Sequence, residues 1–356
     1  MRIVFDVSPL SHPLTGVGNY IRGSLGGLVE AAAGRHEIVA FAPTSFAGRK
    51  TIPAALSGLD VELKLVPLPL SQRWRDAWSR GGRPSLERVV GRLDVFHHSD
   101  WMYPAQSGGV RATTIHDLVP LRFPEWTTAK TQSMHNAKYA DTRTCDLVFV
   151  NSAYTGDDVV ERLGVDPSRV KVARPGLKPE FRAEGERSDL GRPYALTVAT
   201  LEPRKNLGTL AKAHRLLEGE PLLAAAGSSG WGEQPLLSGP DVVRLGFVAD
   251  EELARLYRGA AVAVYPSRFE GFGMPIVEAM ACGVPVVASS HPSMDEAAGD
   301  AAVRANPDDP AEIATAIREA IDRRDELVAR GLAHAARFSW RSVGETFLAA
   351  YEEAAA

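Results

Sequence analysis

Residues 264–289 read V-Y-P-S-R-F-E-G-F-G-M-P-I-V-E-A-M-A-C-G-V-P-V-V-A-S, and this stretch decides the fold of the chain. The apolar run 261–265 stops at Pro266 and predicts a strand. A glycine-containing loop follows, then a helix over 276–282 that Pro275 introduces, and a second buried strand over 284–288. Strand, loop, helix and strand in this order are typical of a parallel sheet, which binds ligands at the carboxyl ends of its strands.

The start of this helix predicts an anion site. Its first backbone N–H groups, from Gly273 onward, lack partners within the helix, and the helix dipole is positive there, so a diphosphate would be held. Two carboxylates flank this position, Glu270 in the loop and Glu278 about one turn into the helix. Ionised carboxylates repel phosphate but accept hydrogen bonds from hydroxyls. The stretch therefore predicts a ligand that carries both phosphates and sugar hydroxyls.

The whole frame, F-E-G-F-G-M-P-x-x-E-A-M-A-x-G-x-P-V-V-A-S, resembles the signature of glycosyltransferase family 4. The resemblance implies that Glu270 contacts the transferred sugar and that Glu278 binds the ribose hydroxyls of a nucleotide sugar. It implies further donor contacts from the loop and the helix start, at Gly271, Phe272, Gly273 and Met274. The alternative interpretation makes Glu270 a loop charge and Glu278 a solvated helix position, and the burial of Glu278 would distinguish the two.

Length and composition bound the class of protein. At 356 residues the chain exceeds the size at which a single core usually stops growing, so we expect two domains. An apolar content of 45% and a charged content of 24% are typical of a soluble globular protein. The net charge of -4 argues against a nucleic-acid partner. Cys145 and Cys282 fall in opposite halves without C-x-x-C spacing, which indicates reduced thiols in a cytoplasmic protein.

The sequence predicts that any membrane contact is peripheral. The chain begins with a strand-like run rather than a signal peptide, and no apolar run approaches the ~18 residues of a membrane span. Residues 71–93, however, contain six arginines against two acids, with Trp74 and Trp78 at helical i, i+4 spacing. Arginine with tryptophan suits the anionic inner face of a membrane or a lipid-linked acceptor. The alternative interpretation is a solvated face with both tryptophans packed inward.

A glycine loop joins the first predicted strand to the first helix. Residues 12–21 read H-P-L-T-G-V-G-N-Y-I, and Gly16 and Gly18 would let the backbone approach a phosphate or an acceptor group. A dinucleotide fingerprint needs a third glycine where Ile21 stands, so a nicotinamide cofactor is disfavoured. The family resemblance places this loop among the donor-binding elements, at a cleft facing the site of the second domain. A plain tight turn is the alternative.

Histidines follow two further strands of the first half. His97 and His98 end the strand predicted from residue 94, but adjacent residues on a strand point to opposite faces, so a shared metal ion is disfavoured and packing or cleft lining is expected. The strand 111–115 delivers His116 and Asp117 at its carboxyl end, where α/β sites collect.

The segment after this strand also resembles the family. It carries the pattern H-D-x-x-P-x-x-x-P-E, which is found in one branch. The resemblance implies that His116 faces the reacting sugar, where it could hydrogen-bond a sugar hydroxyl or steady charge on the anomeric carbon. Asp117 is then its neighbour on the donor side.

The second half opens with a strand over 194–200, followed by L-E-P-R-K-N. Arg204 and Lys205 therefore stand at the carboxyl end of a strand, where two cations would neutralise the charge that grows on a diphosphate leaving group. The family pattern makes them the diphosphate clamp. Many relatives carry Gly-Arg where this chain has Ala199-Thr200, so the clamp rests on Arg204 and Lys205 alone. The alternative, surface charges at a helix start, is opposed by the helix dipole.

The resemblance also implies the domain organisation, which is the GT-B fold. In that fold two doubly wound, Rossmann-like α/β domains face one another across a cleft. The first, on the acceptor side, covers 1–175, and the second, which binds the nucleotide sugar, covers 193–339. A Pro-, Gly- and charge-rich linker over 176–192 joins them, and the last helix, 340–356, packs back on the first domain. Backbone at Phe247 and Val248 would hold the nucleotide base.

The function that the resemblance implies is a retaining glycosyl transfer from a nucleotide-diphosphate sugar. The acceptor would be a glycan or a lipid-linked group in polysaccharide or glycoconjugate assembly. The chain shows no D-x-D pair of the kind that brings a metal to a diphosphate, so neither a metal nor another cofactor is expected. H-D-x-x-P and L-E-P-R-K-N resemble bacterial mannosyltransferases of polysaccharide assembly, which makes GDP-mannose the first hypothesis for the donor and a UDP-hexose the second.

Three other functions stay open at this point. A retaining glycosidase would use two carboxylates about 5 Å apart but would not need the two cations or the phosphate-type helix start. A nucleotide-sugar epimerase would convert the donor with no acceptor present. A non-catalytic nucleotide-sugar binding protein would keep the second-domain site and transfer nothing.

Overall fold

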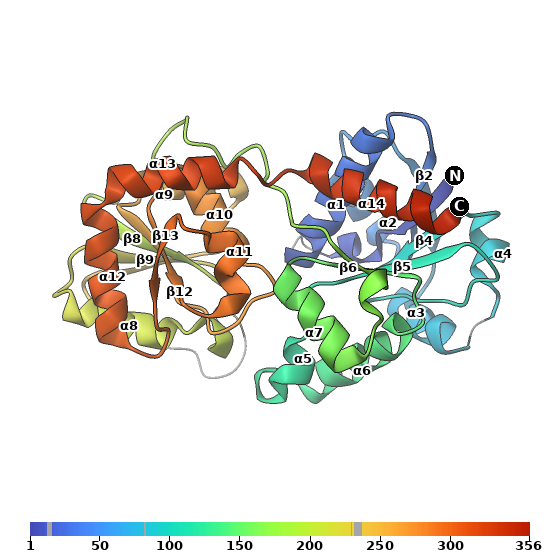
Figure 1. Cartoon of the computed structure of the whole chain (residues 1–356), viewed down its shortest axis with the longest axis horizontal. Coiled ribbons are helices and arrows are strands. Elements are labelled where there is room, and N and C mark those ends of the chain that lie inside the picture. Colours follow the sequence, from blue (N-terminus) through green and yellow to red (C-terminus); the bar gives the residue numbers. More distant parts are fainter. Residues whose placement is uncertain (13–15, 82, 229, 231–236) are drawn as a thin grey trace. The chain divides into compact units, whose positions relative to one another are not determined.

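The chain forms two compact units, each built on a parallel sheet (Figure 1). The computed structural model describes residues 1–12, 16–81, 83–228, 230 and 237–356. Unit 1 comprises residues 1–176 and 339–356, and unit 2 comprises residues 177–338. Positions 13–15 of the predicted glycine loop, and position 82 of the basic segment, lie outside the described residues. The α/β class predicted from the sequence is confirmed in both units.

The sheet of unit 1 has seven parallel strands in the order β3-β2-β1-β4-β5-β6-β7. Its inner strands are buried on both faces, as expected where helices cover a parallel sheet on both sides, whereas the edge strands β3 and β7 are half-exposed. They are β1 (Arg2–Asp6), β2 (Glu37–Thr44), β3 (Glu62–Pro67), β4 (Val95–His98), β5 (Val110–Ile115), β6 (Leu147–Val150) and β7 (Val170–Val172).

Helices pack on both faces of this sheet. One face carries the helices α1 (Gly16–Ala32), α2 (Gly48–Ala55) and α14 (Trp340–Ala355). The other face carries α3 (Ser71–Gly81), α4 (Leu86–Val90), α6 (Ala129–Thr142) and α7 (Ala153–Leu163), with the short α5 (Val119–Arg122) leading into α6. The predicted helix after Gly18 thus begins at Gly16, so both glycines of the predicted loop lie in the first turn of α1.

Helix α14 belongs to unit 1 although it follows unit 2 in the chain. It lies directly against α1, as the red and blue helices of Figure 1 show. Glycines make this approach possible, because a Cβ on Gly27 would lie 1.8 Å from the carbonyl oxygen of Trp340, and one on Gly344 would lie 2.0 Å from the carbonyl oxygen of Gly27. Further along, the hydroxyl of Tyr351 makes a short hydrogen bond with Nδ1 of His97. His97 is therefore part of the packing under α14.

The basic segment is mostly a packing element. Trp78 is buried and donates its Nε1–H to the carbonyl oxygen of Pro84 at 2.6 Å, while the ring of Trp74 lies 4.8 Å from that of Trp78. Arg75 is buried as well and donates to the carbonyl oxygen of Pro43 at 2.9 Å. Trp78 and the half-buried Trp74 pack against the sheet, which favours the alternative interpretation for the two rings, and the membrane contact stays a prediction. The exposed arginines are 73, 80, 83, 88 and 92.

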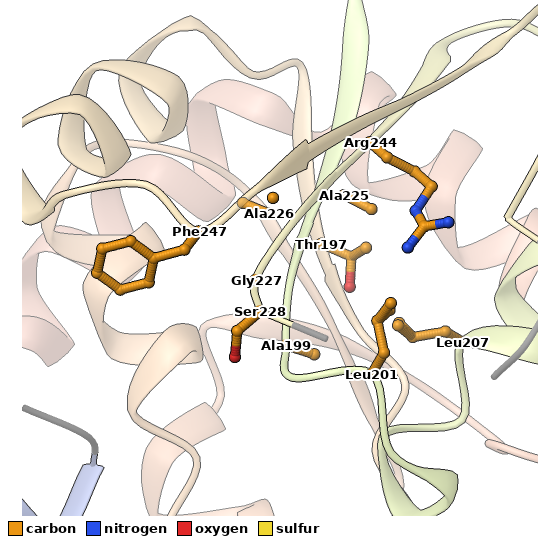
Figure 2. A pocket seen from close by; sticks show the side chains of 11 residues that line it. Thr197, Ala199, Leu201, Leu207, Ala225, Ala226, Gly227, Ser228, Arg244 and Phe247 are labelled. Carbon is orange, nitrogen blue, oxygen red and sulfur yellow. The ribbon is translucent and has the colours of Figure 1, made fainter. Parts of the chain in front are cut away.

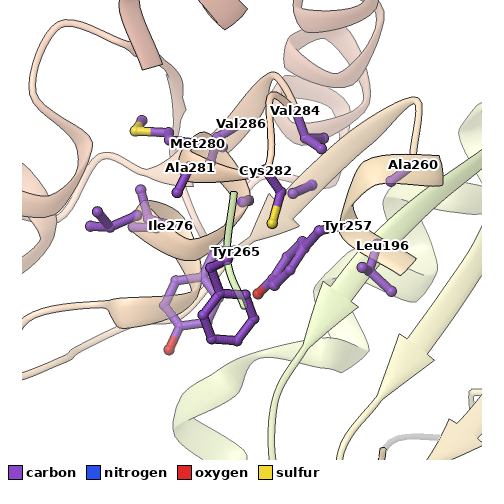
Figure 3. Packing of buried hydrophobic residues seen from close by; sticks show 14 of the residues in the cluster. Leu196, Tyr257, Ala260, Tyr265, Ile276, Met280, Ala281, Cys282, Val284 and Val286 are labelled. Atoms are coloured by element: carbon purple, nitrogen blue, oxygen red, sulfur yellow. The ribbon is translucent and has the colours of Figure 1, made fainter. Parts of the chain in front are cut away.

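The sheet of unit 2 has six parallel strands in the order β10-β9-β8-β11-β12-β13. They are β8 (Tyr194–Val198), β9 (Leu222–Ala226), β10 (Val242–Gly246), β11 (Val262–Tyr265), β12 (Val286–Ser289) and β13 (Ala302–Ala305). One face carries α8 (Leu207–Leu216) and α12 (Pro310–Asp322), and the other carries α9 (Asp250–Gly259), α10 (Met274–Ala281), α11 (Asp295–Ala298) and α13 (Arg324–Ala335). Tyr257, Ile276 and Met280 pack in the second of these layers (Figure 3).

The segment predicted as a linker is part of unit 2. Phe181 is buried in the core of that unit, and Arg258 donates from Nε to the carbonyl oxygen of Glu186 at 2.7 Å. Arg258 also donates to the carbonyl oxygen of Arg182 at 3.2 Å. Arg258 of α9 thus fixes the backbone of this non-periodic segment on unit 2. The Pro, Gly and charge content of the segment does not indicate this packing.

The strand order reverses direction once in each sheet, between β1 and β4 and between β8 and β11. Loops that leave the carboxyl ends of such neighbouring strands diverge, and open α/β sheets bind ligands in the crevice between them. In unit 2 the two loops are those that carry Arg204 and Glu270, and so the fold places the predicted residues at the expected edge.

Candidate active site

The centre of the candidate site is a cluster of two cations and two carboxylates at this edge of unit 2. Glu270 accepts from Nη1 of Arg204 at 2.7 Å and from Nζ of Lys205 at 2.6 Å. Arg204 also pairs through Nε with Glu202 at 2.7 Å, and Lys205 donates to the hydroxyl of Tyr265 at 2.8 Å. The structure thus brings three of the four predicted catalytic residues into direct contact and adds Glu202 and Tyr265, which sequence reasoning missed.

Local backbone geometry holds these side chains in place. Arg204 and Lys205 lie in a single 3-10 turn, Pro203–Lys205, which ends at Asn206 in a left-handed conformation with φ 58°. The side-chain amide of Asn206 donates to the carbonyl oxygen of Pro266 at 3.1 Å. The backbone N–H of Arg268 donates to the carbonyl oxygen of Arg204 at 2.8 Å. The two loops therefore form one hydrogen-bonded unit at the switch point of the sheet.

Glu270 is a permanently ionised carboxylate. Burial would raise its pKa, but the Arg204 and Lys205 cations outweigh burial and hold the pKa at about 2. The carboxylate of Glu270 also accepts a hydrogen bond from the hydroxyl of Ser267 at 2.5 Å. The backbone N–H of Glu270 donates to Ser293 Oγ at 3.1 Å. A group that stays ionised and paired can orient a substrate or stabilise positive charge, but it cannot serve as a proton donor at neutral pH.

The helix start predicted as an anion site has the expected geometry. Gly273 caps α10 with φ 103°, a conformation that side chains rarely adopt, and Met274 and Pro275 follow as the first helical residues. The side chain of Phe272 is buried against the ring of Phe338 at 5.4 Å, so only its backbone is available to a ligand. If this loop contacts the donor, Gly271 and Phe272 would do so through their backbone, and these contacts stay a prediction.

Glu278 lies half-buried on α10 and is not a fully solvated position. Burial raises its pKa to about 7, with Asp250 acting in the same direction and Lys178 against it. The hydroxyl of Tyr257 lies 3.5 Å from Oε2 of Glu278, and Lys178 is itself paired with Asp250 at 2.5 Å. Lys178, Asp250 and Tyr257 surround Glu278 without any signal in the local sequence, because they come from two other segments of unit 2.

A pocket of about 270 Å³ opens at the carboxyl ends of β8, β9 and β10. Phe247, one of the two residues predicted to hold the base, lies on one side of it, and Arg244 and Leu207 lie on the other (Figure 2). Gly227 lets the end of β9 approach β8, since a Cβ there would lie 1.9 Å from the carbonyl oxygen of Ala199. Phe247 is 75% exposed, whereas Val248 packs on the core, so Phe247 is the side chain of the pair that a planar base could contact.

In unit 1, His116 follows β5 and lies against residues from two other elements. The amide nitrogen of Asn151 lies 3.3 Å from its Nδ1, and the ring of Tyr20 lies 5.0 Å from the imidazole, edge to face. Burial lowers the pKa of His116, so the ring is neutral, and with Nδ1 accepting from Asn151 its proton stays on Nε2. Asn151 directly follows the neighbouring strand β6, and the sequence analysis did not single it out.

The other predicted residues of unit 1 have structural contacts. Asp117 accepts the N–H of Val119 at 2.9 Å and so caps the turn into α5. Gly18 is buried in the first turn of α1, and Gly16 is exposed there, with no atom of the described residues within 4 Å of a Cβ built on it. These observations do not test the donor contacts expected of Asp117, Gly16 and Gly18, which stay predictions.

A cluster of His98, Asp141 and Cys145 also has potential metal ligands within 4.8 Å of one another. Its carboxylate is already neutralised, because Asp141 pairs with Arg111 at 2.6 Å, and the ammonium of Lys138 lies 3.3 Å from Nδ1 of His98. His97 and His98 face opposite sides of the sheet, as predicted. The positive charges of Arg111 and Lys138 oppose the binding of a metal cation, so we assign the cluster to packing.

Comparison with known proteins matches both halves of the chain. The family model "Glycosyltransferase Family 4" matches residues 15–181, and "Glycosyl transferases group 1" matches residues 192–323. O-antigen chain mannosyltransferase B of Escherichia coli is 29% identical, over 99% of this chain and 100% of its own. D-inositol 3-phosphate glycosyltransferase 1 of Catenulispora acidiphila is 30% identical, over 75% of this chain and 74% of its own. The structure of Anabaena HepE in complex with UDP and glucose aligns with a TM-score of 0.69 at 16% identity, over 99% of this chain and 100% of its own.

Proposed function

This chain belongs to glycosyltransferase family 4, and from that premise we propose that it transfers mannose from GDP-mannose to a glycan or lipid-linked acceptor, with retention of configuration and without a metal ion. The observation that carries the proposal is the contact of Arg204, Lys205 and Glu270 at the switch point of the unit 2 sheet. As a family 4 glycosyltransferase the chain is an enzyme, so the glycosidase, epimerase and non-catalytic alternatives are set aside.

The cluster supports a leaving-group role for its cations. As the bond between the anomeric carbon and the diphosphate breaks, negative charge grows on the phosphate oxygens, and fixed cations stabilise that charge. Glu270 is a weak base, because its pKa is about 2 and Arg204 and Lys205 already pair with it, so in our proposal a phosphate oxygen of the leaving group takes the proton of the acceptor hydroxyl. The new bond from acceptor oxygen to anomeric carbon then forms on the face that the diphosphate leaves, which retains the configuration.

The donor assignment rests on the relatives. A mannosyltransferase is 29% identical over the whole of this chain, which favours a mannosyl donor. HepE has the same fold and was solved with UDP and glucose, so a UDP-hexose is the second candidate. The exposed ring of Phe247 at the 270 Å³ pocket supports base stacking for either nucleotide.

A lipid-linked acceptor would bring the enzyme to a membrane surface. No helix among the described residues has the length and apolar character to cross a bilayer. The five exposed arginines of residues 71–93 support a peripheral contact with anionic lipid, on the side of the membrane where the nucleotide sugar is present. This contact is electrostatic in our proposal, since both tryptophans of the segment pack against the sheet.

Calorimetric titration with GDP, UDP, dTDP and ADP in the presence of a chelator tests the proposal. We expect GDP to bind most tightly, with the affinity unchanged by the chelator. Preference for UDP would replace the donor, and binding that needs added metal would overturn the metal-independent mechanism. Transfer of radiolabelled mannose from GDP-mannose to a membrane or glycan fraction then tests the reaction itself.

Donor affinity is expected to rise with pH through the neutral range. Glu278, with a pKa of about 7, is partly protonated in the free protein, and the ionised form is the one that accepts two ribose hydroxyl hydrogen bonds. Each pH unit below the pKa costs up to about 1.4 kcal/mol, a factor of about ten in Kd. We expect GDP-mannose to bind about tenfold more weakly at about pH 6 than at about pH 8. Glu278→Gln cannot ionise, so the same pH dependence in that variant would contradict the assignment.

A further inference from the structure

Unit 2 carries a second pocket, of about 510 Å³, at the amino ends of β8 and β11. The donor-side cluster lies at the carboxyl ends of the same strands, so the body of the sheet separates the two. For a strand of five residues such as β8 this separation is about 17 Å. The charged residues of its lining are Arg187, Asp189, Arg192, Arg258 and Arg324.

Four arginines from three segments of unit 2 meet in this pocket, two of them from the segment before β8. Arg324, the first residue of α13, donates from Nη1 to the carbonyl oxygens of Ala260 and Ala261, at 3.3 and 2.8 Å. Arg258 is held by the carbonyl oxygens of the segment before β8, and Arg192 pairs with Asp241 at 2.7 Å. Within the described parts of the chain, Arg187, Arg258 and Arg324 form no ion pair with a carboxylate.

The lining holds four arginines against one acid, Asp189, although Arg192 is paired with both Asp241 and Glu220. Burial lowers the pKa of Arg324, and the neighbouring charge of Arg187 lowers it further, which places the two guanidinium groups in mutual repulsion. Asp189 is the acid of the lining, and its Oδ1 already accepts the N–H of Gly191 at 2.8 Å. The Arg324 guanidinium is partly desolvated beside the like charge of the exposed Arg187, and an anion placed between the two would offset their repulsion.

The walls of the pocket are preformed. A Cβ on Gly259 would lie 2.1 Å from the carbonyl oxygen of Ser188, so this glycine lets the segment before β8 lie directly on α9. The N–H of Ser188 donates to the carbonyl oxygen of Arg255 at 3.0 Å, and the hydroxyl of Tyr194 donates to that of Leu256 at 2.7 Å. A ligand would meet Arg258 and Arg324 already held in position by hydrogen bonds, which reduces the entropy lost on binding.

We propose that this pocket binds a phosphate-bearing small molecule through Arg187 and Arg324, at a site separate from the donor site. The planar guanidinium group matches phosphate oxygens in pairs, and Arg324 uses only Nη1 for its two backbone hydrogen bonds. A volume of about 510 Å³ is that of a small-molecule site and exceeds what one phosphate group fills, so a sugar phosphate or a nucleotide would be accommodated.

Pyrophosphate titration of the full chain tests this assignment. We compare wild type with Arg187→Gln and Arg324→Gln, which each remove one cation from the pocket, and with Arg330→Gln as the matched control. Arg330 lies further along α13, pairs with Glu326 at 3.1 Å and is not in the pocket. Both pocket variants are expected to bind pyrophosphate at least about tenfold more weakly at this site, whereas the control binds as wild type does.

A fourth variant separates the two sites. Arg204→Gln removes a cation at the opposite edge of the sheet. We expect this variant still to bind pyrophosphate, and we expect that binding to be lost when Arg187→Gln is added to it. Arg187 is exposed, so its replacement by Gln is not expected to disturb the fold. Wild-type affinity in both pocket variants, or loss of all binding in Arg204→Gln, would overturn the proposal, as would the absence of pyrophosphate binding by wild type.

Discussion

Replacing Glu270 by Gln is expected to lower kcat by a factor of about 10²–10³ while the affinity for GDP stays the same or increases. The cluster of Glu202, Arg204, Lys205 and Glu270 is neutral as a whole in the ligand-free protein, with Glu270 within 2.7 Å of both cations. Gln removes the negative charge and leaves the cations in place. The diphosphate then meets an excess positive charge, but the positive charge that develops on the sugar loses its neighbouring anion.

The separation of kcat from affinity is the informative part of this test. Turnover is measured with GDP-mannose as donor, and affinity by calorimetry with GDP. Glu251→Gln is the matched control, since Glu251 lies exposed on α9 of the same unit. Loss of GDP binding together with turnover would show that Glu270 acts only by holding the loops together, and unchanged turnover would remove it from the reaction.

Replacing Lys205 by Met is expected to weaken both donor binding and turnover, with kcat/KM lowered by about 10³. Met keeps the apolar stem of Lys but removes the ammonium, which lies 2.6 Å from Oε1 of Glu270 and 5.2 Å from the centre of the Tyr265 ring. The diphosphate loses one of its two fixed cations. Glu270 is left with Arg204 alone, so the free energy of its buried charge rises.

Lys212→Met provides the control for this variant, because Lys212 is an exposed residue of α8, a few residues further along the chain. Thermal unfolding of both variants shows whether the loss of activity follows from a loss of stability. If Lys205→Met reduces turnover but leaves GDP affinity unchanged, the ammonium acts on the transition state alone. If neither quantity changes, Lys205 is not part of the clamp.

The central stretch of the chain could be predicted because its signals are local. An apolar run that ends at Pro266 predicts β11, and a proline and a glycine bracket α10, whose observed bounds differ from the predicted ones by no more than two residues. The clamp residues follow β8 directly, so the rule that sites collect at carboxyl strand ends was sufficient to find Arg204 and Lys205.

Other features depend on contacts between distant segments. Asn151 meets His116 because β5 and β6 are neighbours in the sheet, and Lys178 meets the α10 helix from a segment predicted to be a linker. The basic segment shows the same limit, since composition alone does not tell that Arg75 and Trp78 are the buried members of the set. In each case the deciding quantity is which side chains the tertiary fold brings together.

The return of α14 to unit 1 has a consequence for biosynthesis. Phe347, Leu348 and Tyr351 are part of the core on the α1 face of the first sheet, and they follow unit 2 in the chain. A ribosome that has translated unit 1 up to residue 176 must still make all of unit 2 before that face can be covered. Unit 2 is continuous in sequence, so it can complete its fold before unit 1 does. The nascent chain exposes apolar surface for the whole of that interval, and a chaperone that shields it would raise the yield of active enzyme.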